Sequence, residues 1–332
     1  MRNRILGVLY GMAIGDAMGM PPELWSRKRF LDTYGEITDF LDGHPDNIIS
    51  FQYKKGNFTD DTSQALTILD SLIETDFVPD GKNIANHILE WARKENAFDN
   101  NILGPTSKVT LELFSKGESG KEFSDQALSN GAAMRIPPVG TLFTPDDGKA
   151  LCDYVKNISS ITHSSDITLT GACMVAMGVA SAVAGRDKNQ MIEDVIKIED
   201  YAMSLGAETV SASIGTRIRY GVQLADKYQN DETAFLEELY NMMGAGVNTA
   251  DSVPCAIAIA YYSYEDAHKC ALLCANLGGD TDTIGAMAVA ICGGVKGIEG
   301  FPKEDIQLIK TANNVDFSYY ADKILEKRGK LA

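Results

Sequence analysis

Two short acidic clusters stand out as residues that could do chemistry. The first is TDDT at residues 59–62, within GNFTDDTSQAL, and the second is DTDT at residues 280–283, within NLGGDTDT. Each alternates or pairs carboxylates with hydroxyls, and each directly precedes an apolar run. Carboxylate and hydroxyl oxygens are the ligands that hard cations prefer in proteins.

Helix capping is the alternative explanation for each cluster. Thr59 could cap the helix that follows it, and Asp60 and Asp61 suit the positive end of the helix dipole. One cluster alone is best explained in this way. Two such clusters in one chain favour a shared cation site, because neighbouring carboxylates repel one another unless a cation or strong donors intervene.

The ligand types narrow the cation to Mg²⁺, Mn²⁺ or Ca²⁺, since no histidine or cysteine lies near either cluster. The spacing of an EF-hand calcium loop is absent. Four carboxylates carry too much charge for a single divalent ion. We therefore expect either two ions, or one ion with a carboxylate left over as a base.

Two further stretches could contact a ligand. In SNGAAMRIPPVG, residues 129–140, Asn-Gly before small residues suggests a tight turn whose exposed N–H groups could hold a phosphate. In THSS, residues 162–165, a histidine stands before a long apolar segment. A plain turn and a structural histidine are the alternatives for these two stretches.

Five stretches together carry a resemblance to a known family. GDAMGMPPE (15–23), TDDT (59–62), NGAAMR (130–135), TH (162–163) and NLGGDTDTIGA (276–286) follow one another in the order typical of that family. With these motifs the chain resembles the ADP-ribosylglycohydrolases, which include the dinitrogenase-reductase-activating glycohydrolase and the ADP-ribosyl-acceptor hydrolases. The motifs are highly specific as a set, although none would be so alone.

The resemblance implies an all-α fold with a centre of two Mg²⁺ or Mn²⁺ ions. By motif match, the metal ligands are Thr59, Asp60, Asp61, Asp280, Asp282 and Thr283. Glu23 matches a carboxylate on a mobile loop near the metals that serves in acid–base chemistry. The candidate catalytic residues are therefore Glu23, Asp60, Asp61 and Asp282, and which of them is the general base stays open.

The resemblance also assigns substrate contacts. Ser129, Asn130 and Gly131 match a loop whose backbone holds the diphosphate, and Met134 belongs to the same loop. His163 matches a position close to the phosphates and the distal ribose. A weaker match places Gly104 at the substrate cleft.

The activity implied by the resemblance is hydrolysis of the bond between C1″ of ADP-ribose and a modified protein residue. We expect an arginine-linked substrate rather than a serine-linked one. One alternative is a non-catalytic protein that binds ADP-ribose or confers immunity to an ADP-ribosylating toxin. Another is a metal-dependent phosphohydrolase, which would release AMP or phosphate.

Helices must position these residues, because apolar residues recur with helical spacing along the chain and alternating strand patterns are almost absent. We expect a single large all-α domain over residues 1–332. The periodic segments begin near residues 5, 65 and 284, and further helices are expected at 82–95, 105–116, 146–158, 166–185, 187–203, 205–226, 231–242, 251–276, 303–312 and 316–328.

The first helix carries a second pattern, because Gly7, Gly11, Gly15 and Gly19 recur every four residues. Such a stripe of glycines lets another helix approach closely. We expect this second helix to pack against the glycines in the core of a soluble protein. Asp16 falls on the core-facing stripe of the same helix. A buried aspartate needs donors or a cation.

Composition excludes some functions. The net charge of −16 over 332 residues disfavours nucleic acid and anionic membranes as partners. The six cysteines lie in apolar surroundings without a CxxC pair, which favours free thiols in the cytoplasm. The apolar segments at residues 1–16 and 167–185 resemble a signal peptide and a membrane span. Their many small residues are more typical of buried helices.

Overall fold

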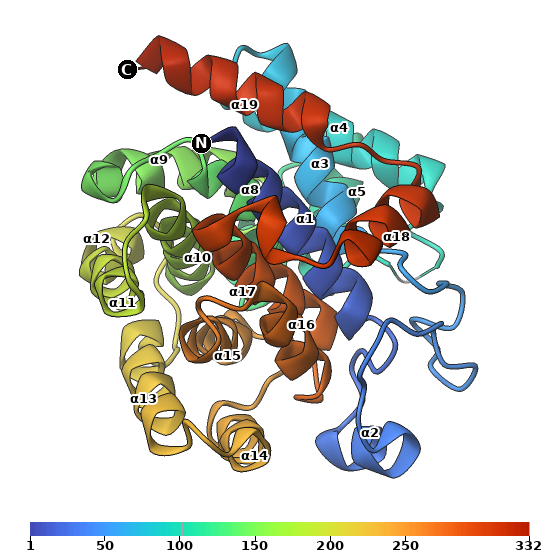
Figure 1. The fold of residues 1–332 in the computed structure, drawn as a ribbon. Helices are drawn as coiled ribbons and strands as arrows, with labels where there is room; N and C mark the ends of the chain where they lie inside the picture. The colour runs from blue at the N-terminus through green and yellow to red at the C-terminus, as the bar shows by residue number, and fades with distance from the viewer. Residues whose placement is uncertain (101, 332) are drawn as a thin grey trace.

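The computed structural model describes residues 1–100 and 102–331, and these form helices joined by loops, with no strand among them (Figure 1). The prediction of an all-α domain is confirmed. The helices are α1 (Arg2–Gly19), α2 (Arg27–Tyr34), α3 (Asp60–Glu74), α4 (Gly81–Lys94), α5 (Pro105–Ser115), α6 (Lys121–Asp125), α7 (Gly131–Met134), α8 (Pro137–Gly140), α9 (Gly148–Ser159), α10 (Asp166–Ala184), α11 (Lys188–Lys197), α12 (Glu199–Met203), α13 (Ile214–Lys227), α14 (Glu232–Met243), α15 (Thr249–Tyr262), α16 (Ala267–Ala275), α17 (Thr281–Lys296), α18 (Lys303–Asn313) and α19 (Ser318–Leu331), with 3₁₀ turns at Pro145–Asp147 and Ile298–Gly300.

The central pair is α1 against α17, and the glycine stripe of α1 makes their close approach possible. A Cβ on Gly7 would lie 2.1 Å from the carbonyl oxygen of Gly293, and a Cβ on Gly15 would lie 2.1 Å from that of Gly285. The order of these contacts shows that the helices run antiparallel. The expectation of a tightly packed partner helix is thus confirmed. The pair brings the C-terminal end of α1 next to the N-terminal end of α17.

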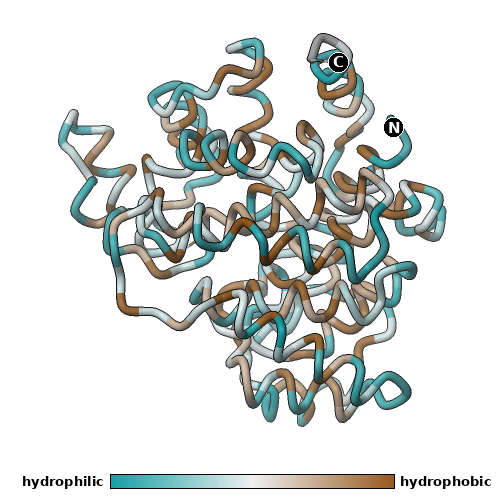
Figure 2. Tube along the Cα trace, turned by 90° about the vertical axis from the view of Figure 1, so that its left-hand side faces the viewer, coloured by the Kyte–Doolittle hydropathy of each residue, from teal (hydrophilic) through white to brown (hydrophobic). Residues whose placement is uncertain are grey.

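Helix α10 packs beside this pair in the middle of the molecule (Figure 1). It is long and apolar enough to cross a membrane, but 94% of its apolar window is buried inside the protein. Figure 2 shows the same distribution, with the hydrophobic trace gathered inside and hydrophilic segments on the periphery. Residues 167–185 therefore behave as the core helix that their small-residue composition predicts.

Several helix boundaries differ from the prediction, for tertiary reasons. The helix expected at 205–226 begins only at Ile214, because Ala207 pairs with Ser165 in an isolated bridge. The helix expected at 251–276 divides into α15 and α16, since Asp266 caps a new helix there by accepting a hydrogen bond from the N–H of Lys269. The short helices α2, α6, α7 and α8 were not predicted.

Candidate active site

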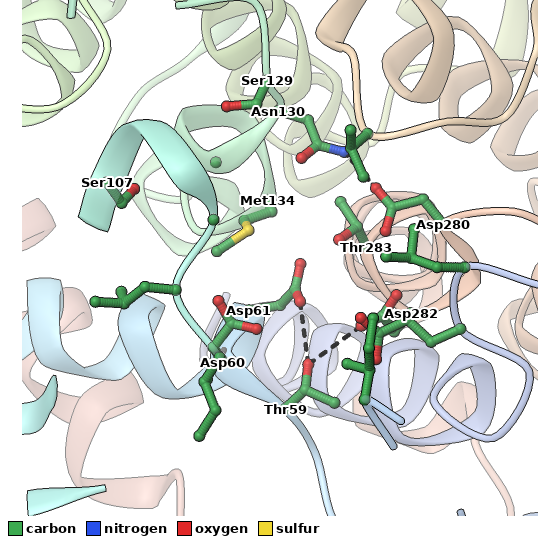
Figure 3. Close-up of a pocket in the computed structure, with 18 of the residues that line it drawn as sticks. Thr59, Asp60, Asp61, Ser107, Ser129, Asn130, Met134, Asp280, Asp282 and Thr283 are labelled. Carbon is green, nitrogen blue, oxygen red and sulfur yellow. Dashed lines mark hydrogen bonds between the residues drawn. The ribbon is translucent and has the colours of Figure 1, made fainter. Parts of the chain in front are cut away.

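One cavity of 410 Å³ brings all of the sequence-predicted site residues together. It lies between the N-terminal ends of α3 and α17, with α5 and the segment leading into α7 on the opposite side (Figure 3). The predicted residues on its wall are Glu23, Thr59, Asp60, Asp61, Gly104, Ser129, Asn130, Gly131, Met134, His163, Asp280, Asp282 and Thr283. Their positions are observed, and their roles stay predictions.

The first acidic cluster does not cap its own helix in the expected way. Thr59 occupies the N-cap position of α3, but its side chain accepts no capping hydrogen bond. Its Oγ1 lies 2.8 Å from Asp16 Oδ1. The same hydroxyl lies 3.1 Å from Asp61 Oδ2 and 3.5 Å from Asp282 Oδ2 (Figure 3). The alternative explanation for this cluster, helix capping by the Thr59 side chain, is therefore not supported, and the metal-ligand role of Thr59 stays a prediction.

Asp16 of α1 does the capping instead. Its Oδ1 accepts a hydrogen bond from the N–H of Thr59 at 2.8 Å, and its Oδ2 accepts one from the N–H of Thr62 at 3.1 Å and another from Thr62 Oγ1 at 2.6 Å. The buried aspartate thus finds the donors that its place on the apolar stripe requires. Through these bonds α1 fixes the first turn of α3.

The residues of the second cluster, DTDT at 280–283, also make contacts beyond the start of their own helix. Asp280 occupies the N-cap position of α17 without a side-chain capping bond, and its Oδ2 accepts from Asn130 Nδ2 at 2.6 Å. Thr281 Oγ1 donates to the carbonyl oxygen of Gly19 at 2.6 Å and so ties α17 to α1. Asp282 and Thr283 line the cavity, whereas Thr281 does not. Thr281 thus packs against α1, while its neighbours Asp282 and Thr283 face the cavity.

Glu23 reaches the cavity from the loop that follows α1. Pro21 and Pro22 end the helix, and Leu24 then adopts a left-handed φ of 57°. The loop is fixed to the start of α17, because Leu24 N donates to the carbonyl oxygen of Gly279 and Gly279 N donates to that of Trp25, both at 2.7 Å. Glu23 itself stays partly exposed at the cavity wall.

The carboxylates fit a hard cation. One oxygen each from Asp16, Asp61 and Asp282 lies within 4.8 Å of the other two, and all three residues are buried. Asp61 Oδ1 and Asp282 Oδ1 have no hydrogen-bond partner among the described residues. Buried carboxylate oxygens without donors are costly unless a cation satisfies them. Asp16 is not among the sequence-predicted ligands, although its place on the core-facing stripe of α1 was a signal.

The acidic groups raise one another's pKa values. Burial raises the pKa of Asp60 to about 7 and that of Asp16 to about 6, and in Asp60 the charge of Asp16 adds to the effect. Burial followed by neighbouring carboxylate charge also raises the pKa values of Glu23, Asp61 and Asp282 well above their usual range. Burial is the first cause of each shift, because it disfavours the charged form of a carboxyl group.

The opposite wall carries the predicted substrate contacts. The expected tight turn is instead the start of a short helix, because Gly131 begins α7. Of the N–H groups expected to be free, that of Asn130 donates to the carbonyl oxygen of Val247 at 2.9 Å. Ser129 and Met134 line the cavity beside them. Gly104 precedes α5, and a Cβ atom at this position would have no neighbouring atom within 4 Å. The cavity is therefore open beside Gly104.

His163 is buried behind Ser129. Its Nε2 lies 3.2 Å from Ser129 Oγ and its Nδ1 lies 2.9 Å from Thr162 Oγ1. Burial, with a contribution from the charge of Arg135, lowers the pKa of His163 to about 3, so the imidazole is neutral at pH 7. It can donate or accept hydrogen bonds here but carries no charge.

Comparisons with known proteins show what the whole chain is similar to. The profile of the ADP-ribosylglycohydrolase family matches residues 1–331. The uncharacterized protein YegU of Escherichia coli K12 is 40% identical over 98% of this chain and 97% of its own length. The ADP-ribosylarginine hydrolase Tri1 of Pseudomonas putida is 24% identical over 94% of this chain and 76% of its own. A solved structure titled as an ADP-ribosylglycohydrolase-related protein complex superposes with a TM-score of 0.71, at 21% identity and 98% coverage of both chains, and supports the fold.

Proposed function

The chain belongs to the ADP-ribosylglycohydrolase family, and we propose that it is a metal-dependent hydrolase that releases ADP-ribose from modified protein. The bond cleaved would join C1″ of the ribose to an acceptor side chain. One observation carries the proposal above all: the buried carboxylates with unsatisfied oxygens line the same cavity as Ser129 and His163. The cavity thus offers a cation site and uncharged polar groups within reach of one ligand.

The cation site would be built from both helix starts. Asp61 and Asp282 present buried oxygens without partners, and Thr59, Asp280 and Thr283 line the cavity next to them. Bound Mg²⁺ or Mn²⁺ would orient the ribose hydroxyls and lower the pKa of a nearby water molecule. Two ions would balance this much negative charge better than one.

Glu23 is suited to proton transfer. It lies at the cavity wall on a loop held by backbone hydrogen bonds, and burial, with the charge of the surrounding carboxylates added, raises its pKa well above the usual range. A carboxyl group positioned at the reacting atoms can act as a general acid or base. In glycoside hydrolysis such a group protonates the leaving group or activates the attacking water.

The neutral polar wall would bind the diphosphate and distal ribose. Ser129, with His163 behind it, offers hydrogen-bonding groups without adding charge. Ile102 and Leu103, which precede Gly104 in the chain, add apolar lining to the cavity. Such a mixture of apolar lining and a few polar groups is typical of small-molecule sites.

We favour arginine-linked ADP-ribose as the substrate. A relative named as an ADP-ribosylarginine hydrolase matches nearly the whole chain, which supports this choice over a serine linkage. The test is to incubate the protein with Mg²⁺ or Mn²⁺ and with proteins ADP-ribosylated on arginine or on serine, and to identify the product. Release of intact ADP-ribose that disappears with EDTA and in Asp60→Asn supports the proposal.

Three other results would redirect it. AMP as the product would indicate a phosphohydrolase, and tight binding without release from either linkage would indicate a binding or immunity protein. Faster release from serine than from arginine would reverse the preferred linkage. Asp305→Asn is a matched control, because Asp305 is a buried aspartate that bonds His268 and does not line the cavity.

A further inference from the structure

Arg135 is a buried arginine that directly follows α7. Its residue is 1% exposed, and among the described residues it forms no ion pair. One terminal nitrogen donates to Gln64 Oε1 at 2.7 Å, the other donates to Thr162 Oγ1 at 2.5 Å, and Nε has no partner. Arg135 is not on the cavity wall, yet both of its partners contact residues that are.

Stability alone does not explain this arrangement. A buried charge costs several kcal/mol unless a counter-charge and hydrogen bonds compensate it, and an apolar residue of similar volume is often more stabilising. Here burial lowers the pKa of Arg135 to about 10, and the nearest compensation is the charge of Asp60 rather than a direct ion pair. An arginine at this point therefore points to a role in ordering its neighbours.

The first branch leads to the acidic side of the cavity. Because Arg135 has only donors, Gln64 must present its carbonyl oxygen to Arg135 and its amide nitrogen to the other side. That nitrogen donates to Asp60 Oδ2 at 2.8 Å. The guanidinium thus fixes the orientation of the amide, and the amide holds one oxygen of Asp60.

The second branch leads to the polar wall. Thr162 Oγ1 accepts from Arg135, so its single proton is free to go elsewhere. It can reach His163 Nδ1 at 2.9 Å or the carbonyl oxygen of Ser159 at 3.4 Å, and the shorter contact is the better hydrogen bond. With Nδ1 as an acceptor, the neutral imidazole carries its proton on Nε2, which donates to Ser129 Oγ at 3.2 Å.

We propose that Arg135 is a positioning residue for both walls of the cavity. Through Gln64 it holds Asp60, and through Thr162 it holds His163 as the Nε2–H tautomer. Ser129 then accepts from the imidazole and directs its own hydroxyl proton into the cavity, toward an acceptor such as a phosphate oxygen. The inference rests on the proposed function for the ligand it names, but the hydrogen-bond polarity stands on the contacts alone.

The tautomer of His163 tests the second branch directly. Long-range ¹H–¹⁵N NMR of the full-length protein, without metal and with Mg²⁺, distinguishes a protonated from an unprotonated ring nitrogen, and His163→Gln identifies the signals. We expect the Nε2–H form in the wild type and in Thr162→Ser, which keeps the hydroxyl. Thr162→Val and Arg135→Met should both populate the Nδ1–H form.

Affinity for Mg²⁺ tests the first branch. Residues that orient metal ligands typically change affinity by about 10- to 100-fold when replaced. Calorimetric titration should therefore show a loss of this size in Gln64→Met and Arg135→Met and none in Thr162→Val. Arg4→Met is the matched control, because Arg4 is a partly buried arginine that donates to carbonyl oxygens of α10, and it should change neither readout.

A folded Arg135→Met protein that keeps both the Nε2–H tautomer and the wild-type Mg²⁺ affinity would overturn the proposal. If that variant does not fold, the branch variants decide, and an unchanged tautomer in Thr162→Val or an unchanged affinity in Gln64→Met would overturn it. Neither readout uses a substrate. A protein without hydrolase activity that shows the expected pattern would therefore refute the proposed function and leave this inference standing.

Discussion

Replacing Asp282 by asparagine should stabilise the protein when no divalent cation is present. Its carboxylate lies within 4.8 Å of those of Asp16 and Asp61. At that distance, with an effective dielectric constant of about 20, each pair of unit charges repels by about 3 kcal/mol. Protonation of one carboxylate also relieves this repulsion. For a carboxyl group of ordinary pKa, that protonation costs about 4 kcal/mol of free energy at pH 7. We expect Asp282→Asn to gain about 3 kcal/mol of unfolding free energy.

The gain should depend on pH in a defined direction. Burial raises the pKa of Asp16 to about 6, and burial with neighbouring carboxylate charge raises that of Asp60 to about 7 and that of Asp282 well above its usual range. Between the unfolded pKa of about 4 and these folded values, the native state binds more protons than the unfolded state, so its stability falls as pH rises. The advantage of Asp282→Asn should therefore be small near pH 4 and reach its full size above about pH 7.

The assay is urea unfolding in EDTA at about pH 5 and about pH 8, with the unfolding free energy extrapolated to zero urea. In a thermal scan, the gain corresponds to about 4 °C for a chain of this length. Asp166→Asn is the matched control. Asp166 is also a buried aspartate, but it accepts hydrogen bonds from Thr209, so its replacement should destabilise the protein.

Two outcomes would refute the reasoning. Asp282→Asn could be less stable than the wild type in EDTA at pH 8, which would mean that the carboxylate is satisfied by protein donors. Its advantage could also be the same at both pH values, which would mean that charge repulsion is not its source. Saturating Mg²⁺ should reverse the order, because only the wild type keeps the full set of cation ligands.

Three further predictions concern packing and the cation site. Gly15→Ala should cost about 3 kcal/mol or more in unfolding free energy, measured by urea titration, because its Cβ would lie 2.1 Å from the carbonyl oxygen of Gly285. Thr281→Val should lower the unfolding free energy by about 1 to 3 kcal/mol through the lost bond to Gly19, while Mg²⁺ affinity measured by calorimetry stays unchanged. Thr283→Val should do the reverse, weakening Mg²⁺ binding with little loss of stability in EDTA; equal effects of the two threonine variants would contradict the division between them.

Local pattern in the sequence was enough to predict the helical fold and the meeting of the two acidic clusters. The stripe of glycines in α1 predicted a close helix partner, and the stripe of apolar residues marked Asp16 as a buried charge. Both patterns follow helical periodicity within about twenty residues of sequence. Which helix packs against α1 depends on tertiary contacts with α17, and no local sequence pattern predicts it.

What escaped prediction depends on contacts between distant segments. Thr59 has the sequence of a helix cap, yet the carboxylate of Asp16, 43 residues away in the chain, takes over that task. The link from Arg135 to Gln64 spans 71 residues, and nothing in the local sequence distinguishes this arginine from an exposed one. The late start of the helix expected at 205–226, at Ile214, likewise follows from pairing with the segment before α10.

We propose that the cavity binds divalent cations and that the protein needs them to release ADP-ribose, and identification of the released product decides this proposal. The substrate is a protein ADP-ribosylated on arginine, incubated with Mg²⁺ and either wild type or Asp61→Asn, and the released nucleotide is identified by mass. We predict intact ADP-ribose from the wild type and none after EDTA or from Asp61→Asn. Release of AMP, or no release of ADP-ribose from this substrate by a protein that binds Mg²⁺, would contradict the proposal.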